Sequence, residues 1–267
     1  MLAFANAKIN LGLQVIRKRT DGYHDLETVF YPVRINDVIE INDAAVTSFV
    51  VSGIEIPGDA IDNLCMMAFN ALKKDFDLPS QQITLLKNIP IGAGLGGGSS
   101  DAAFLVKLLN EKFRLKLSEQ QMENYVRPLG ADCPFFISNK PVYAEGIGDV
   151  FSPVELDLSP YEIVVLKPNI HVSTADAYSG IVPSLPTKSV KELIHLPLKD
   201  WHASIFNDFE KTVFERHPQI KMLKEDLYQR GAIFALMSGS GSSVFGIFEK
   251  RPDLEDLKAN CQIFYGC

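Results

Sequence analysis

Hydrophobic and polar residues alternate along the first fifteen residues of the chain. Six apolar side chains share one face of this segment and three polar ones share the other: Ala5, Ala7, Ile9, Leu11, Leu13 and Val15 against Asn6, Lys8 and Asn10. An alternation with a period of two residues is typical of a strand that is buried on one side. We therefore predict a strand over 3–15, a polar turn over 17–22 and one or two more strands over 26–41.

Longer apolar repeats and capping residues predict helices further along the chain. One helix is expected over 64–76, with Asp62 or Asn63 as its cap. Another is expected from about Ser100 to Phe113, after a glycine-rich loop. A third begins at Ser118, where Ser-Glu-Gln-Gln resembles a capping box. The region 208–231 is predicted to be helical, with a break at Pro218.

Short apolar runs predict further strands over 81–86, 161–166, 234–237 and 244–248, while 140–160 holds turns and short strands. Strands and helices that are mixed in this order indicate an α+β protein with two domains. We place the domains at 1–150 and 151–267.

The composition narrows the classes of function. The chain has 267 residues, 46% of them hydrophobic, which is enough for one large or two modest domains. A net charge of -7 argues against a nucleic-acid-binding surface. No apolar run approaches the length of a membrane span, and no signal peptide is indicated. Four cysteines have no zinc-type spacing: Cys65, Cys133, Cys261 and Cys267. We therefore expect a cytoplasmic protein without membrane or nucleic-acid partners.

The candidate chemistry is concentrated in the sequence PIGAGLGGGSSDAA, at 90–103. Its five glycines, at positions 92, 94, 96, 97 and 98, allow backbone N–H groups to approach an anion closely. The helix that follows adds free N–H groups and a partial positive charge. A loop of this kind suits phosphate, and a flexible linker would not need so many glycines directly before a helix.

Two other nucleotide-binding motifs fit the loop less well. Gly92, Gly94 and Gly97 match the dinucleotide fingerprint, but the strand that should follow the helix is missing. A P-loop is excluded because no Gly-Lys-Ser/Thr follows. The motifs of protein kinases are absent as well.

Several polar residues outside the loop are candidates with two interpretations each. Lys8 is either a catalytic cation or part of a solvent-facing strand surface. Asp132 is either a catalytic carboxylate or a helix cap before Pro134. His24 either binds a ligand or is simply exposed. The stretch 238–243 (SGSGSS) is either a second phosphate-facing loop or a hairpin turn. The five histidines form no metal-ligand motif.

Taken together, these segments resemble the GHMP kinases, a superfamily of small-molecule kinases. The resemblance rests on the strand with Lys8, the glycine loop and the late glycine motif at 237–245. Four motifs narrow it: AKINLGL at 7–13, DGYHDL at 21–26, GLGGGSSDAA at 94–103 and GADCPFF at 130–136. They are similar to the branch that phosphorylates the 2-hydroxyl of a cytidine-diphosphate-linked polyol in the non-mevalonate isoprenoid pathway.

The resemblance implies roles for individual residues. Lys8 and Asp132 would be catalytic. The ATP phosphates would be held by the loop residues Pro90, Ile91, Gly92, Ala93, Gly94, Leu95, Gly96, Gly97, Gly98, Ser99 and Ser100. Asn63 and Lys87 would line the adenine pocket. The cytidine substrate would be bound by Asn10, Tyr23, His24, Thr174 and Tyr178. ATP and Mg²⁺ are the implied cofactors, with the protein ligands of the metal and the oligomeric state left open.

The resemblance also implies a fold. Its N-terminal domain has a left-handed βαβ unit and its C-terminal domain is ferredoxin-like, with the active site between the domains. Three alternatives remain at this point. Another kinase of the superfamily would lack a reason for Tyr23 and His24, because its substrate carries no cytosine. A regulator that had lost catalysis would not be expected to retain both Lys8 and Asp132. A dinucleotide oxidoreductase would bind NAD(P).

Overall fold

The computed structural model describes residues 1–266, and these pack into two compact units. The first, which we call the N-unit, is made of Met1–Ala7, Ile35–Ile91 and Gly96–Lys140. The second, the C-unit, is made of Lys8–Arg34, Gly92–Leu95 and the chain from Pro141 onward. Packing thus joins segments that are distant in the sequence. The division into 1–150 and 151–267 stays a prediction, and Cys267 lies outside the described residues.

Two long strands contribute to both units. β1 (Leu2–Lys18) pairs with β2 (His24–Asp43), and a short turn joins them. β1 confirms the strand that was predicted over 3–15. The region 26–41 lies within one continuous strand rather than two.

In the N-unit, β4 (Gln81–Lys87) has a partner on each side. It pairs in parallel with β3 (Ser48–Gly53) and antiparallel with the second half of β2, where Val38 lies opposite Leu86. The chain passes from β3 through a helix to β4, so these elements form a parallel βαβ unit. The hand of this unit stays a prediction. β4 confirms the strand expected over 81–86, whereas β3 was not predicted.

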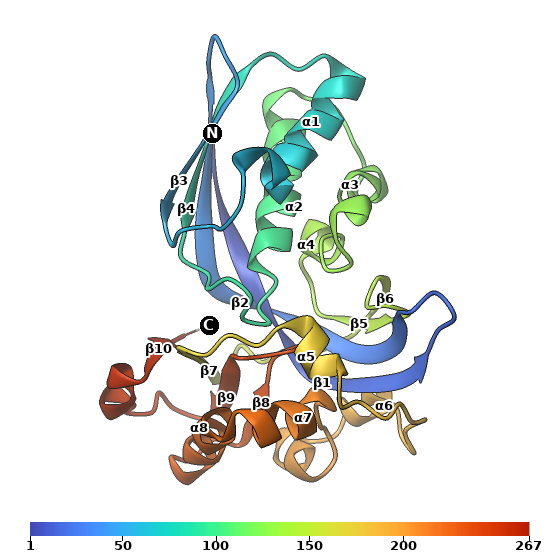
Figure 1. Cartoon of the computed structure of the whole chain (residues 1–267), viewed down its shortest axis with the longest axis vertical. Coiled ribbons are helices and arrows are strands. Elements are labelled where there is room, and N and C mark those ends of the chain that lie inside the picture. Colours follow the sequence, from blue (N-terminus) through green and yellow to red (C-terminus); the bar gives the residue numbers. More distant parts are fainter. Residues whose placement is uncertain (267) are drawn as a thin grey trace. The chain divides into compact units, whose positions relative to one another are not determined.

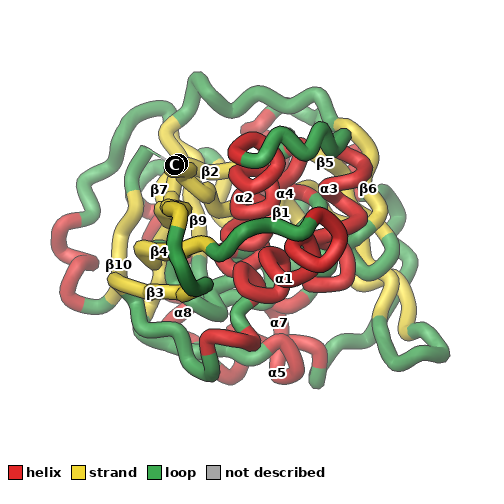
Figure 2. Tube along the Cα trace, turned by 90° about the horizontal axis from the view of Figure 1, so that it is seen from above, coloured by secondary structure: helices red, strands yellow, loops and turns green. Residues whose placement is uncertain are grey.

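The helices of the N-unit lie on one side of β3 and β4 (Figure 1). α1 (Leu64–Phe76) and α2 (Gly97–Lys112) run side by side (Figure 2), and α3 (Glu119–Val126) and α4 (Phe135–Ser138) also pack against α2. The helix predicted over 64–76 is confirmed, and α2 begins a turn earlier than Ser100.

The capping box predicted at Ser118 is confirmed at the start of α3. The hydroxyl of Ser118 accepts the backbone N–H of Gln121 at 3.3 Å, and the Gln121 side chain accepts the N–H of Ser118 at 2.9 Å. This reciprocal pair satisfies two of the orphan donors at the helix start.

The C-unit contains a four-stranded antiparallel sheet with the order β10-β7-β9-β8. Its strands are β7 (Glu162–Pro168), β8 (Phe234–Met237), β9 (Val244–Phe248) and β10 (Cys261–Phe264). Counted along the chain, this order is 4-1-3-2, which is the ferredoxin-like arrangement. The strands predicted over 161–166, 234–237 and 244–248 are confirmed, and β10 was not predicted.

Two helices of the C-unit show the break that was predicted at Pro218. α7 (Phe209–Arg216) ends just before this proline, and α8 (Pro218–Gln229) begins with it and packs against β8 and β9. Apolar residues of α7, α8 and this sheet share one buried cluster with the middle of β1, including Leu13, Val213 and Met237. Burial of these side chains is the main source of stability for the unit.

The remaining elements are short. β5 (Val142–Glu145) pairs antiparallel with the first half of β2, and β6 (Val150–Pro153) pairs with β5. The short helices are α5 (Thr174–Tyr178), α6 (Val190–Leu193), η1 (Ala60–Asp62), η2 (Arg127–Leu129), η3 (Leu198–Ala203) and η4 (Glu255–Ala259). Within residues 1–266, no helix has the length and apolar character that crossing a membrane would take.

Candidate active site

The glycine-serine loop joins β4 to α2, and its backbone conformation favours glycine. Gly92, Gly94 and Gly96 have φ angles of 60°, 75° and 70°, in the left-handed region that other residues enter at a cost. A Cβ on Gly94 would also lie 2.0 Å from the carbonyl oxygen of Ser238. Gly94 therefore allows the loop to pack closely on the second glycine-serine stretch, 238–243.

The N-terminus of α2 is open. Gly96 occupies the N-cap position and has no side chain with which to cap the first turn. Gly98 is exposed, and the nearest described atom to a Cβ built on it is Leu64 Cδ1, at 3.7 Å. Free N–H groups and the helix dipole give this turn a positive potential. Such a helix start can accept an anionic group.

The two serines that follow have different surroundings. Ser100 is buried, and its hydroxyl donates to the carbonyl oxygen of Asn6 at 2.6 Å. Ser99 is hydrogen-bonded to the thiol of Cys133. A Cβ on Gly130 would lie 3.3 Å from Cys133 Sγ and 3.6 Å from Ser99 Oγ. The segment that carries Asp132 thus packs against the first turn of α2.

Asp132 lies half-buried in the turn before α4. The N-cap of that helix is Pro134, so Asp132 is not its cap. Its neighbour Cys133 is buried, and burial raises the pKa of the Cys133 thiol to about 11. A neutral thiol of this kind agrees with a small buried side chain rather than a nucleophile.

A buried group of three ionisable side chains, which we call the loop cluster, lies next to the glycine loop. It consists of Lys87 at the end of β4, Asp37 on β2 and Asp101 on α2. Lys87 Nζ forms an ion pair with Asp37 and a second one with Asp101, at 3.1 Å. Burial, and then the charge of Asp37, raise the pKa of Asp101 to about 8, although Lys87 opposes this shift. Lys87 was predicted as a site residue and Asp101 lies in the motif at 94–103, but nothing in the sequence pointed to Asp37.

Asn63, the other residue predicted for the adenine pocket, caps α1. Its side-chain oxygen accepts the backbone N–H of Cys65 at 2.9 Å, as the sequence predicted for a capping residue. Asn63 and Lys87 both belong to the N-unit, together with Asp132 and the start of α2.

Lys8, in the C-unit, is buried rather than solvent-facing, so the interpretation of this face as a solvated strand surface is wrong. The Lys8 side chain is 4% exposed, and its Nζ donates to Asn10 Oδ1 at 2.6 Å and lies 4.7 Å from the centre of the Phe30 ring. Asn10 in turn donates to Thr28 Oγ1 at 2.9 Å. The Lys8 backbone N–H donates to the carbonyl oxygen of Leu95 in the glycine loop, at 2.9 Å.

The stretch 238–243 supports the glycine loop from within the C-unit. Ser238 is buried; its hydroxyl donates to the carbonyl oxygen of Gly94 at 2.8 Å and accepts the backbone N–H of Asn10 at 3.2 Å. Asn207 holds the stretch itself by donating to the carbonyl oxygens of Met237 and Gly239, both at 2.8 Å. No local motif marks Asn207, so its role was not predicted from the sequence.

Two of the residues predicted to bind cytidine, His24 and Tyr178, form an aromatic group in the C-unit together with Phe209. His24 stacks on Tyr178 with ring centres 4.7 Å apart and an angle of 21° between the rings. Tyr178 packs edge-on against Phe209. Tyr23 is 62% exposed, and Thr174, at the start of α5, is also exposed. The structure thus brings His24 and Tyr178 together, whereas Tyr23 projects outward.

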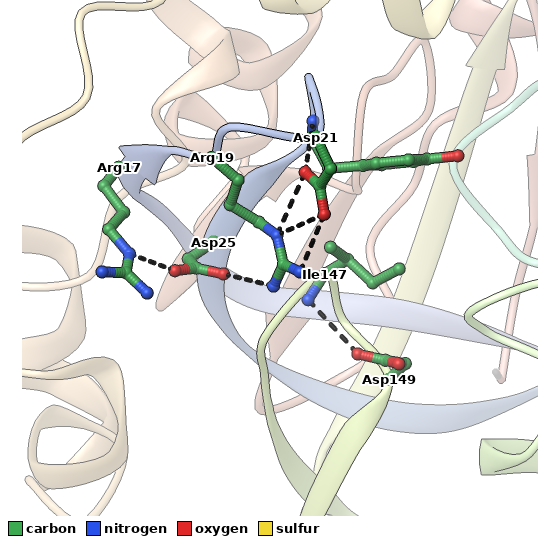
Figure 3. Close-up of polar contacts among 7 residues, drawn as sticks. Arg17, Arg19, Asp21, Asp25, Ile147 and Asp149 are labelled. Atoms are coloured by element: carbon green, nitrogen blue, oxygen red, sulfur yellow. Dashed lines mark hydrogen bonds and ion pairs between the residues drawn. The ribbon is translucent and has the colours of Figure 1, made fainter.

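A second group of charges, which we call the hairpin cluster, holds the turn between β1 and β2 (Figure 3). Arg19 lies between two carboxylates, with contacts of 2.8 Å to Asp21 and 3.1 Å to Asp25. Arg17 forms an ion pair with Asp25 as well. The carboxylate of Asp21 also accepts the backbone N–H of Tyr23 at 3.1 Å. These contacts fix the backbone that carries Tyr23 and leads into His24.

The comparisons with known proteins agree with this fold and loop. The model for the GHMP kinases N terminal domain matches residues 63–140, and the model for the GHMP kinases C terminal matches 189–267. The class that the fold and the glycine loop define is therefore that of the GHMP kinases. Solved structures of more distant members share the fold, such as a homoserine kinase from Cytophaga hutchinsonii, with a TM-score of 0.64 and 16% identity over 98% of this chain and 95% of that one.

Closer relatives narrow the class. The 4-diphosphocytidyl-2-C-methyl-D-erythritol kinase of Bacteroides fragilis is 55% identical over 96% of this chain and 95% of the relative. That of Cytophaga hutchinsonii is 52% identical over 95% and 94%. A crystal structure of 4-(cytidine 5'-diphospho)-2C-methyl-D-erythritol kinase superposes with a TM-score of 0.82 at 31% identity, covering 100% of this chain and 98% of the other. The chain belongs to the 4-diphosphocytidyl-2-C-methyl-D-erythritol kinase family.

Proposed function

We propose that this chain transfers the γ-phosphoryl group of ATP to the 2-hydroxyl of 4-diphosphocytidyl-2-C-methyl-D-erythritol. The product is the 2-phosphate, an intermediate of the non-mevalonate route to isoprenoid precursors. Sequence identity to 4-diphosphocytidyl-2-C-methyl-D-erythritol kinases over nearly the whole chain supports this reaction. The structural observation that carries it is the open, uncapped start of α2 behind the glycine loop.

The start of α2 supports ATP as the phosphoryl donor. The backbone N–H groups of its first turn would hold phosphate oxygens, and the exposed Gly98 leaves space for a close approach of the nucleotide. Mg²⁺, when bound, would offset the charge of the β and γ phosphates. Residues 1–266 contain no group of three or more His, Cys, Asp or Glu side chains placed to hold a metal. We therefore assign the ion to the phosphates rather than to a protein cage.

Asp132 is the proposed general base. In this proposal it accepts the proton of the substrate hydroxyl as the phosphoryl group is transferred, a contribution of about 10²–10⁴-fold in rate. Lys8 is proposed to offset negative charge at the reacting oxygen. Its burial and its short contact with Asn10 support a role that needs a fixed cation.

The aromatic group in the C-unit is the proposed cytidine site. Stacking of a base on an aromatic ring is worth about 1–3 kcal/mol. We propose that Tyr23 and Tyr178 stack on the cytosine, that His24 hydrogen-bonds its edge, and that Asn10 and Thr174 contribute polar contacts. The stack of His24 on Tyr178 supports this proposal because it brings two of the predicted residues together.

We further propose that Asn63 and Lys87 lie near the adenine of ATP. Both side chains also have partners within the protein, Cys65 and Asp101.

We also propose a cytoplasmic location. The reaction consumes ATP, and Cys65, Cys133 and Cys261 are buried free thiols, which is typical of a reducing compartment.

The test is a phosphoryl-transfer assay on the full chain. With MgATP and the cytidylated substrate, we expect the 2-phosphate by mass spectrometry, and no product with homoserine or mevalonate. Asp132→Asn should lower kcat about 10²–10⁴-fold while ADP binding is retained. Asp256→Asn, the same change at an exposed residue of η4, should keep full activity. If a related enzyme makes product under conditions where this chain does not, the proposed reaction is wrong; if Asp132→Asn turns over normally, Asp132 is not the base.

A further inference from the structure

The loop cluster connects the two ends of the glycine loop. On the entering side, the carboxylate of Asp37 accepts the backbone N–H groups of Asn88 and Ile89, at 2.6 and 2.8 Å. These are the residues that lead from β4 into the loop. On the leaving side, Asp101 belongs to α2, the helix that the loop opens into. Lys87 forms an ion pair with both aspartates.

The same lysine lies directly against the start of α2. A Cβ built on Gly97, the first residue of the helix, would lie 2.9 Å from Lys87 Nζ and 2.8 Å from Ile89 Cγ2. Only glycine allows this approach, because a methyl group would collide with both the Lys87 ammonium and the Ile89 side chain. The position of Lys87 is thus coupled to the position of the first turn of α2.

We propose that Asp37, Lys87 and Asp101 form a positioning cluster for the nucleotide phosphates, and that its net charge tunes the affinity for nucleotide. The inference rests on the proposed function, in that α2 must receive nucleotide phosphates. Neither aspartate needs to touch the nucleotide. The three side chains together hold the two ends of the glycine loop in one geometry. They also place charge next to the start of α2, where the phosphates would bind.

The charge of the cluster depends on Asp101. Oδ1 of Asp101 is buried and has no hydrogen-bond partner among the described residues. An unpaired carboxylate oxygen in such a place favours the protonated form. Burial accordingly raises the pKa of Asp101 to about 8. The titratable groups that face Asp101 are Lys87, Asp37 and, on α1, Cys65. Burial raises the pKa of the Cys65 thiol, so this thiol stays neutral.

The sign of the coupling follows from these charges. Near neutral pH, the protonated Asp101 leaves one ammonium opposite one carboxylate, so the cluster is neutral. Above pH 8 Asp101 ionises, and the cluster carries a net negative charge below the helix start that binds phosphate. The negative cluster and the bound phosphates then repel each other, so bound nucleotide favours the protonated form of Asp101. Nucleotide binding should therefore take up protons near pH 8 and weaken at higher pH.

Calorimetric titration of the full chain with MgADP tests this coupling. The phosphates of ADP are already ionised at pH 7, because their last pKa is about 6. We expect binding to be about three- to tenfold weaker at pH 9 than at pH 7. At pH 8 the binding heat should vary with the ionisation heat of the buffer, which reports proton uptake. Asp101→Asn should bind ADP like the unsubstituted chain at pH 7, with less than about twofold loss at pH 9.

Asp43→Asn is the matched control. It makes the same change in the same unit, at an exposed carboxylate whose partner is Lys112 at 2.9 Å, and it should keep the pH dependence of the unsubstituted chain. In the kinase assay at pH 9, Asp101→Asn should lower the KM for ATP and leave the KM for the cytidylated substrate unchanged. A merely structural role of Asp101 would not lower the KM for ATP while leaving the KM for the cytidylated substrate unchanged.

The outcomes distinguish a failure of the proposed function from a failure of the inference about the loop cluster. If the unsubstituted chain binds no ADP at either pH, the proposed function fails and the inference fails with it. If ADP binds but no proton is taken up at pH 8, the inference alone is overturned, and this measurement needs no variant. An equal loss of affinity at pH 9 in Asp101→Asn and in the unsubstituted chain overturns it too.

Discussion

The loop cluster and the hairpin cluster share one design, a basic side chain between two aspartates, but they differ in burial. In the loop cluster the side chains of Lys87 and its two partners are no more than 3% exposed. In the hairpin cluster, Arg19 is 39% exposed and Asp21 is 46% exposed. The same arrangement of charges therefore lies in two different dielectric surroundings.

The difference decides what each cluster can do. A buried charge must keep its partner, because desolvation without compensation costs several kcal/mol. The loop cluster therefore specifies a single geometry for the strand and the helix that it joins. An exposed ion pair is screened by water and salt and contributes little. The hairpin cluster supports a turn that its backbone hydrogen bonds also hold, such as that from the Arg19 N–H to the Tyr23 carbonyl oxygen, at 2.8 Å.

The largest effect is expected when the basic partner is removed from the buried cluster. Lys87→Met leaves the carboxylate of Asp37 buried without its cation, beside the neutral Asp101, and it should lower the free energy of unfolding by about 3–5 kcal/mol. Urea unfolding followed by circular dichroism measures this change. Lys112→Met is the matched control, because its partner Asp43 is 83% exposed, and it should lose no more than about 1 kcal/mol. Equal losses in the two variants would show that burial does not separate the two kinds of ion pair.

A pH series sharpens the comparison, because the two clusters should respond in opposite directions. The pKa of Asp101 is near 3.8 in the unfolded chain and about 8 in the native state. Between these two pH values, the native state therefore holds a proton that the unfolded state has lost. Stability must then fall as the pH rises through this range. Asp101→Asn removes this dependence, so the variant should gain stability relative to the unsubstituted chain between pH 5 and pH 9, measured as free energies of unfolding.

The hairpin cluster provides the contrast in the same series. Hydrogen bonds and charge from Arg19 lower the pKa of Asp21, and Arg17 and then Arg19 lower the pKa of Asp25. The stabilisation from these carboxylates is present at neutral pH and is lost as the pH falls through their native pKa values. Asp21→Asn should therefore converge with the unsubstituted chain at acid pH. Convergence at alkaline pH instead would contradict the assignment.

Sequence reasoning succeeded where the signal was local. The cap at Asn63, the capping box at Ser118 and the break at Pro218 each depend on residues within one turn, and all three are present. Strands with a clear apolar period were found for the same reason. The start of α2 was placed too late because its first residues are glycines, which have low helix propensity and were assigned to the loop.

The contacts that sequence reasoning missed are between distant parts of the chain. Asp37 and Lys87 are fifty residues apart, and only the register of β2 on β4, with Val38 opposite Leu86, brings them together. Asn207 and Gly239 are also far apart in the sequence, by thirty-two residues, and meet only in the folded chain. Lys8 was placed wrongly for another reason: the alternation along β1 predicted one solvated face, but the strand is buried on both faces from Ala7 to Leu13. A period of two residues cannot show that a polar face is also covered.

The smallest effect is expected from Arg19→Gln, which breaks the hairpin cluster while leaving the backbone turn. The KM for the cytidylated substrate should rise slightly at low salt, because Tyr23 and His24 lose part of the support for their backbone. At about 1 M salt the Debye length is near 3 Å, so the pair is already screened in the unsubstituted chain and the two proteins should become equal. The stability loss in Lys87→Met should persist at the same salt, because buried charges are screened much less. A rise in KM that survives 1 M salt would mean that the hairpin cluster acts through fixed geometry, like the loop cluster, and that its exposure does not determine its function.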